Sequence, residues 1–108
     1  RGEEIPRAIT MLQQATKLAP DEPAYLDSLG WAYFRAGQGD LALPLLEKAV
    51  ASAPGESDIS EHLGDVLWSQ GRRFEARYAW AAAGVNASGE GKERIARKTE
   101  RGPDGTNP

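Results

Sequence analysis

The architecture of this chain follows from one stretch, Leu26-Asp27-Ser28-Leu29-Gly30-Trp31-Ala32-Tyr33. Leu26, Leu29 and Tyr33 recur at intervals of three and four residues, which is the spacing of one face of an α-helix. Gly30 lies inside that helix, where glycine costs about 1 kcal/mol relative to alanine. A glycine in this place indicates that the backbone of a neighbouring helix passes too close for a side chain.

A turn and a second helix follow this stretch. The turn is Ala36-Gly37-Gln38-Gly39-Asp40. In it, Gly37 can adopt the left-handed backbone that ends many helices, and Asp40 is suited to cap the next one. Apolar residues then recur with helical spacing up to Pro54, which cannot continue a helix because it lacks an amide hydrogen. The sequence therefore predicts a pair of antiparallel helices.

The pattern repeats along the chain at a constant offset. The aligned positions are Ala8 with Ala42 and Ala76, Leu12 with Leu46 and Trp80, and Leu29-Gly30 with Leu63-Gly64. A period of about 34 residues with these residue types is characteristic of helix-turn-helix repeats. We therefore expect an all-α fold.

One set of residues carries a family resemblance: Leu26, Leu29, Gly30, Tyr33, Ala42, Leu46, Ala49 and Pro54. In this order and spacing they resemble the tetratricopeptide repeat, and a second copy follows with Leu63, Gly64 and Trp80. The resemblance covers about residues 4–88, and the stretches 27–33 and 61–65 resemble the C-terminal repeats of a larger bacterial tetratricopeptide repeat protein. The resemblance implies an α-α superhelix of antiparallel helix pairs, a right-handed solenoid with a C-terminal capping helix.

The repeat divides the chain into three parts. The first is a repeat array at 1–88, made of a half repeat at 4–20 and repeats at 23–56 and 57–88. Residues 89–101 are mostly charged, with Ile95 and Ala96 as their main apolar residues, and are predicted to form a polar helix that caps the last repeat. Residues 102–108 offer no apolar side chain to a core, so we expect a disordered tail.

Composition excludes several classes of protein. The chain has 108 residues, 13 Lys and Arg against 16 Asp and Glu, and no cysteine. Disulfide scaffolds and Cys-based zinc sites are therefore ruled out, and we expect no membrane insertion, because a span needs roughly 20 apolar residues in a row. The net charge of −3 without a basic cluster argues against nucleic acid as a partner. Composition does not distinguish the cytoplasm from a bacterial cell envelope.

The resemblance implies that ligands bind the concave face, which the first helix of each repeat lines. The side chains expected on that face lie outside the apolar face that Leu26, Leu29 and Tyr33 form, and outside its counterpart in the next repeat. They are Asp27, Trp31, Phe34 and Arg35 in one repeat and Asp58, Glu61, His62, Asp65 and Trp68 in the next. This acidic and aromatic set would repel a carboxylate ligand and suits a protein or peptide with Lys or Arg and an apolar anchor. We therefore expect a non-enzymatic module for protein or peptide binding.

Other interpretations of these residues stay open. The alternative for Trp31 and Trp68 is packing between adjacent first helices. His62 with Asp58 offers two metal ligands, fewer than the three or four of a zinc site, so we expect no metal and no cofactor. One histidine, no cysteine and no glycine-rich phosphate loop argue against an enzyme. The competing hypothesis is that these are terminal structural or self-association repeats of a longer array, without a ligand site of their own.

The first predicted helix presents an apolar surface. Its apolar residues are Ile5, Ile9, Leu12 and Leu18, and the pattern places no partner helix before them. About three repeats are usually needed to bury a core, and residues 4–88 contain two and a half. We expect this surface to pair with another copy, giving a homodimer through residues 5–18. In a longer parent chain the same surface would be internal, so the dimer would result from truncation.

Overall fold

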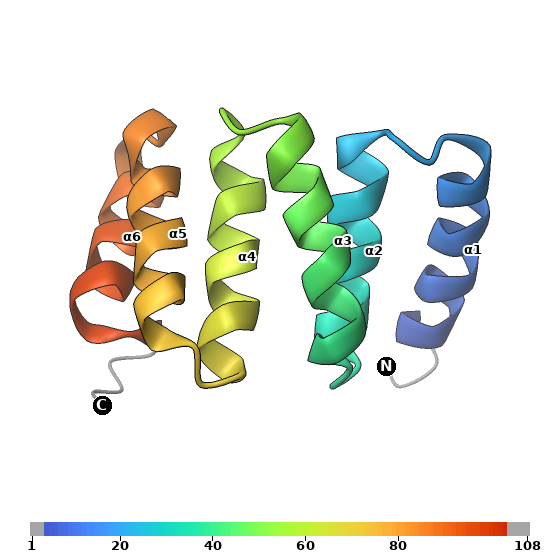
Figure 1. Ribbon diagram of the computed structural model, residues 1–108, viewed down its shortest axis with the longest axis horizontal. Coiled ribbons are helices and arrows are strands. Elements are labelled where there is room, and N and C mark those ends of the chain that lie inside the picture. Colours follow the sequence, from blue (N-terminus) through green and yellow to red (C-terminus); the bar gives the residue numbers. More distant parts are fainter. Residues whose placement is uncertain (1–3, 104–108) are drawn as a thin grey trace. The chain divides into compact units, whose positions relative to one another are not determined.

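The computed structural model describes residues 4–103, and every regular element in that range is an α-helix. The helices are α1 (Glu4–Leu18), α2 (Pro23–Arg35), α3 (Gly39–Ser52), α4 (Ser57–Ser69), α5 (Arg73–Asn86) and α6 (Gly89–Arg101), as labelled in Figure 1. The prediction of an all-α fold is confirmed. The chain divides into two compact units, one with α1 to α3 and one with α4 to α6, and the boundary lies between Ala53 and Pro54.

In the first unit, α2 packs against both α1 and α3. The buried residues of the α2–α3 pair are Leu26, Leu29, Gly30, Ala42, Leu46 and Ala49. These are the positions that carry the repeat pattern in the sequence. The apolar spacing therefore predicted this part of the core correctly, because the spacing itself puts these residues on facing sides of two helices.

Gly30 marks a close approach of α2 and α3, as the sequence predicts. A β-carbon placed on Gly30 would lie 2.9 Å from Cγ of Leu46 and 3.4 Å from the carbonyl oxygen of Ala42. The nearest group is thus a side chain of α3, whereas the sequence suggested the backbone. Because Gly30 has no side chain, there is space for Leu46, which is fully buried.

The turn between α2 and α3 follows the predicted geometry at one residue and departs from it at another. Gly37 has φ of +81°, the left-handed backbone predicted for it, and Gln38 donates its amide to the carbonyl of Tyr33 at 2.9 Å. The prediction that Asp40 caps α3 is wrong, because the N-cap residue is Gln38. Asp40 lies in the first turn of α3, where a negative charge interacts favourably with the helix dipole.

In the second unit, α5 packs against both α4 and α6. Trp80 of α5 is its largest fully buried side chain. A β-carbon on Gly64 of α4 would run into the Trp80 indole, so glycine is needed in α4 for the tryptophan to fit. The second turn repeats the first one, since Gly71 also has φ of +81° and Arg72 donates its amide to the carbonyl of Leu67.

Helix α6 covers the range for which the sequence predicts a polar helix. Ile95 is its one residue in the buried class. The helix ends where Gly102, with φ of +86°, donates its amide to the carbonyl of Lys98 at 2.8 Å. Of the predicted disordered tail, Gly102 and Pro103 are described, and residues 104–108 lie outside the described residues.

Substitution of Gly64 by alanine tests the fit between α4 and α5. We expect Gly64→Ala to lower the free energy of unfolding by about 2 kcal/mol, because overpacking a rigid, buried indole costs more than alanine gains as a helix former. Urea unfolding followed by circular dichroism measures the loss. Gly30→Ala is the matched control, with a smaller expected loss because the flexible Leu46 side chain can shift. Equal losses in the two variants would contradict this account.

Candidate functional site

The first unit carries four of the predicted binding residues on α2. Asp27, Trp31 and Phe34 are spaced by four and three residues, which places them on one side of the helix, and Arg35 lies one turn after Trp31. The Trp31 and Phe34 rings are 5.2 Å apart between centroids and tilted by 39°. Arg35 is exposed, and the other three are half-buried. This face of α2 therefore combines one carboxylate with a pair of contacting aromatic rings.

The second unit brings Glu61 and Asp65 of α4 together with two cations of α6. Nε and Nη2 of Arg94 donate to the two carboxylate oxygens of Glu61, each at 2.8 Å. Nζ of Lys98 donates to Oε2 of Glu61 at 2.6 Å and to Oδ1 of Asp65 at 3.0 Å. We call these four residues the carboxylate–cation cluster. Both of its predicted binding residues are thus bound within the unit.

The cluster is anchored to the core through Trp80. Its indole nitrogen donates to Oδ1 of Asp65 at 3.1 Å, so the residue that fits against Gly64 also orients the second carboxylate. The side chains of Glu61, Asp65 and Lys98 are largely buried, whereas that of Arg94 is about half exposed. Charge-assisted hydrogen bonds in such a place are stronger than neutral ones.

The two carboxylates respond to this environment in opposite directions. Burial by itself raises the pKa of Glu61, but hydrogen bonds and charges from Arg94 and Lys98 outweigh it and lower the pKa from 4.5 to about 2. For Asp65, burial raises the pKa, and the opposing effect of Lys98 and Trp80 does not cancel the rise. The fold therefore favours the ionised form of Glu61 and disfavours the ionised form of Asp65.

Trp68 lies in a cationic environment made by its own unit. The guanidinium groups of Arg73 and Arg77 are 4.7 and 5.2 Å from the Trp68 ring centroid, which is the range of cation–π contacts. The Trp68 and Trp80 rings are 5.4 Å apart. Nε of Arg77 also donates to the carbonyl of Thr99 in α6 at 3.0 Å. The cations in contact with Trp68 are thus Arg73 and Arg77 of its own unit, whereas the sequence predicted a cation of a bound ligand.

Asp58 and His62 lie one turn apart on α4. Asp58 is exposed and His62 is half-buried. Within residues 4–103, no group of three or more His, Cys, Asp or Glu side chains is arranged to hold a metal ion. In the part of the chain that the structure describes, no third such side chain therefore joins Asp58 and His62 in a metal-binding arrangement.

The four apolar residues predicted to drive self-association lie on α1, which packs against α2. Ile5, Ile9 and Leu12 are half-buried, and Leu18 is 88% exposed. Leu18, at the end of the helix, is therefore the most exposed residue of this set.

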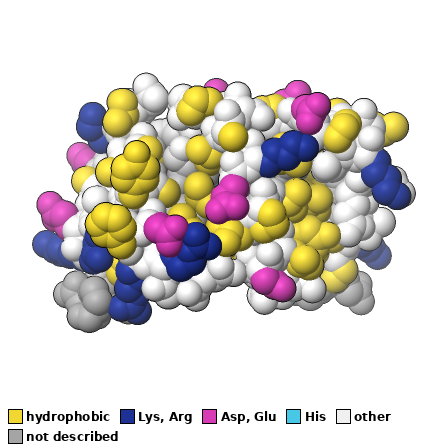
Figure 2. Space-filling model, viewed as in Figure 1, with side chains coloured by type: hydrophobic (Ala, Val, Ile, Leu, Met, Phe, Trp, Pro, Cys, Tyr) yellow, Lys and Arg dark blue, Asp and Glu magenta, His cyan; other side chains and the backbone are white. Residues whose placement is uncertain are grey.

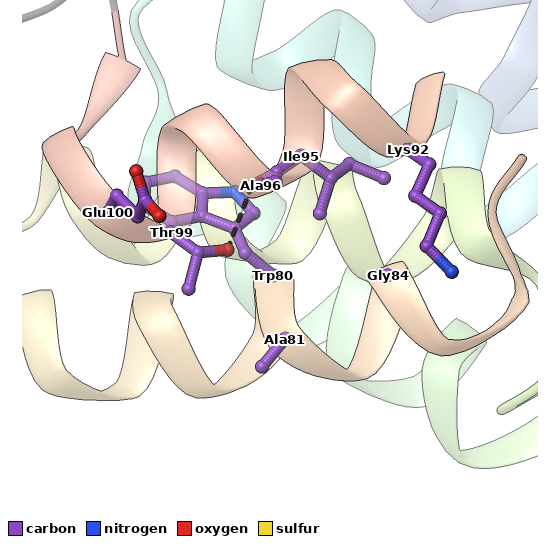
Figure 3. Close-up of a pocket in the computed structure, with 8 residues that line it drawn as sticks. All are labelled: Trp80, Ala81, Gly84, Lys92, Ile95, Ala96, Thr99 and Glu100. Atoms are coloured by element: carbon purple, nitrogen blue, oxygen red, sulfur yellow. Dashed lines mark hydrogen bonds between the residues drawn. The ribbon is translucent and has the colours of Figure 1, made fainter. Parts of the chain in front are cut away.

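A pocket of about 250 Å³ lies between α5 and α6. Its lining residues are Trp80, Ala81, Gly84, Lys92, Ile95, Ala96, Thr99 and Glu100. Figure 3 shows Lys92 and Glu100 at opposite ends of the pocket. The lining between these two is mostly small or apolar, so the pocket suits an apolar group better than a charged one.

The sequence offered one signal for the carboxylate–cation cluster. Glu61 and Asp65 are four residues apart, and so are Arg94 and Lys98, so two helices each present a pair of like charges on one face. Opposite charges at matching spacing identify a possible contact between two helices. The repeat period alone does not show that α6 takes this contact.

The helix pairs in each unit define an α-α solenoid protein built from helix-turn-helix repeats. A family profile described as tetratricopeptide repeat matches residues 1–56 and residues 28–91. The chain belongs to the tetratricopeptide repeat family. Repeats of this family typically act as non-enzymatic scaffolds for protein–protein interaction.

A relative is found among bacterial proteins. The chain is 43% identical over 55 residues to the TPR repeat-containing protein PA4667 of Pseudomonas aeruginosa. The match covers 51% of this chain and 9% of that protein, so the chain spans only a small part of this relative. Separately, the helices in residues 4–103 are all too short or too polar to cross a membrane.

Substitution of Glu61 tests the cluster. The lowered pKa predicts that ionised Glu61 stabilises the fold above pH 4.5, and that this stabilisation is lost as the pH falls from 4.5 towards 2. We expect Glu61→Gln to lower the free energy of unfolding by about 2 to 3 kcal/mol at pH 7 and by progressively less towards pH 2. Chemical unfolding at a series of pH values measures both effects.

Glu75→Gln is the control for this experiment. Glu75 also has a lowered pKa through its ion pair with Arg72, but the pair is exposed to solvent, so its removal is expected to change stability little. A Glu61→Gln effect that equals the Glu75→Gln effect, or that does not depend on pH, would show that the cluster does not hold α6.

Proposed function

We propose that this chain is a non-enzymatic binding module for a basic peptide or protein segment with an apolar anchor. The observation that carries the proposal is the carboxylate–cation cluster. In it, two carboxylates on the first helix of a repeat bind an arginine and a lysine that lie one turn apart on another helix. The same chemistry is available to a basic segment of a partner.

The first unit has the corresponding residues in the same repeat register. Asp27 occupies the position in its repeat that Glu61 occupies in the next one, and Trp31 likewise corresponds to Asp65. Where α4 has a second carboxylate, α2 therefore has an indole next to Phe34. A carboxylate beside an aromatic pair favours a ligand with one cationic and one apolar group. We propose that Asp27, Trp31 and Phe34 make the principal contacts.

In this proposal the second unit contributes less to ligand binding than the first unit does. Glu61 and Asp65 are engaged by α6, and Trp68 is engaged by Arg73 and Arg77. A ligand that uses the α4 carboxylates would have to displace α6. The remaining candidates of the predicted set, Asp58 and His62 on α4 and Arg35 on α2, are assigned a secondary role.

A second candidate function rests on the same cluster. If α6 permanently takes the place of a following repeat on α4, these repeats close the end of a longer array and bind no ligand of their own. The capping role of α6 belongs to this candidate, and so does self-association through Ile5, Ile9, Leu12 and Leu18. The two candidates differ in whether the α2 face binds a peptide.

Peptide titration separates them. We expect a peptide with Lys and Arg around one Leu to change the fluorescence of the chain, and its counterpart with Glu and Asp in place of the cations to leave it unchanged. Asp27→Asn is expected to weaken binding by about threefold to tenfold, and Trp31→Ala by about tenfold or more. Isothermal titration calorimetry measures affinity without relying on tryptophan.

The controls use residues outside the proposed contacts. Trp31→Phe identifies the part of the fluorescence change that comes from Trp31, and Glu75→Gln removes an exposed carboxylate elsewhere. Unfolding curves confirm that each variant is folded. Equal binding of the two peptides, or no binding of either, would reject the proposal and favour the terminal-repeat candidate.

A further inference from the structure

The outer side of α5 exposes a line of apolar residues. Phe74 is 85% exposed, and Tyr78 and Val85 are each 76% exposed. Ala81, which lies between them, is also exposed. We call Phe74, Tyr78, Ala81 and Val85 the α5 seam. Figure 2 shows hydrophobic side chains on the surface over α5. Several large apolar side chains in one exposed line are unusual for an isolated chain and indicate an interaction surface.

The spacing of the α5 seam is that of a coiled coil. Its residues follow one another at intervals of four, three and four, as the a and d positions of a heptad do. The side of α5 that packs inside the unit carries Ala76, Ala79, Trp80 and Ala83. The helix therefore has two apolar sides, and only the inner one has a partner in the described structure.

We propose that the α5 seam binds the α5 seam of a second copy of this chain, with the two helices antiparallel. The argument is one of size. Antiparallel pairing places a against d, so Phe74 faces Val85 of the second copy and Tyr78 faces Ala81. Each large residue then meets a smaller one. Parallel pairing would place Phe74 on Phe74 and Tyr78 on Tyr78, with alanine on alanine beside them.

Charges beside the seam agree with this pairing. Residues at the flanking positions are Glu75 and Ala82 on one edge and Arg77 and Gly84 on the other. In an antiparallel pair each edge meets the same edge of the second copy, so Glu75 lies near Ala82 and Arg77 lies near Gly84. No two like charges meet, and each charged residue faces a small neutral one.

The pocket between α5 and α6 gives Tyr78 of the second copy a place to pack. Ala81 and Gly84 belong to the pocket lining and lie at the seam or beside it. Because Tyr78 of the second copy faces Ala81, its ring is brought to the edge of this hollow. Ile95 contributes apolar lining, and the polar end of Glu100 offers a partner for the tyrosine hydroxyl (Figure 3).

The dimer is expected to be weak. The seam runs from Phe74 to Val85, a length of about 18 Å at a rise of about 1.5 Å per residue. One helix pair of this length buries less area than a stable interface does, so we expect a dissociation constant on the order of 100 µM. The inference does not depend on peptide binding by α2.

Sedimentation equilibrium of the full chain between about 10 µM and about 1 mM tests the proposal. We expect the mass to rise towards that of a dimer, and Tyr78→Glu to weaken association by more than about tenfold, because it buries a charge in the seam. Leu18→Glu changes the competing apolar surface on α1, where Leu18 is 88% exposed, and is expected to leave association unchanged if the α5 seam forms the dimer. A chain that stays monomeric throughout this range, or loses its dimer in Leu18→Glu but keeps it in Tyr78→Glu, would overturn the proposal.

Ala82 tests the orientation of the helices. Antiparallel pairing places Ala82 near Glu75 of the second copy, so Ala82→Lys is expected to tighten the dimer by about threefold and Ala82→Glu to weaken it. Parallel pairing would place residue 82 near Arg77 and reverse both effects. Ala82 is exposed, and Lys and Glu are both good helix formers, so neither variant is at risk of misfolding. The reversed result would overturn the antiparallel arrangement.

Discussion

Each helix pair of this chain depends on a glycine in its first helix that makes room for a large side chain of the second. Gly64 admits Trp80, and Gly30 admits Leu46. Glycine inside a helix costs about 1 kcal/mol, whereas burial of a large apolar side chain contributes about 2 to 3 kcal/mol, so the exchange favours the pair. In the second unit the consequences extend further, because the buried Trp80 also holds Asp65 by a hydrogen bond and lies 5.4 Å from the Trp68 ring.

The local parts of the fold could be predicted because they depend on spacing along the chain. The intervals around Leu26 and Leu46 defined the core, and the positive φ of Gly37 follows from a turn that only glycine adopts easily. Capping was less predictable, since whether Gln38 or Asp40 caps α3 depends on the residue at which the backbone enters the helix.

The candidate site was predictable as a set of residues, but the partners of those residues were not. Glu61 binds Arg94, which lies far along the chain in a segment outside the repeat pattern. No spacing rule within the repeat connects the two, because the contact depends on how α6 folds back along its unit. The first unit differs, because its α2 face presents an aromatic pair in the register where α4 has a second carboxylate.

The way α6 is attached sets the order in which the second unit opens. Ile95 is its one fully covered apolar residue, so attachment depends mainly on the charges of Arg94 and Lys98 and on the bond from Arg77 to Thr99. The contact of the half-exposed Arg94 with Glu61 weakens as ionic strength rises, whereas the more buried contacts of Lys98 and the packing of Trp80 against α4 are screened much less. We therefore expect backbone amides of α6 to exchange with solvent deuterium through a local detachment, at rates that increase with salt, and those of α4 and α5 to exchange through unfolding of the whole unit.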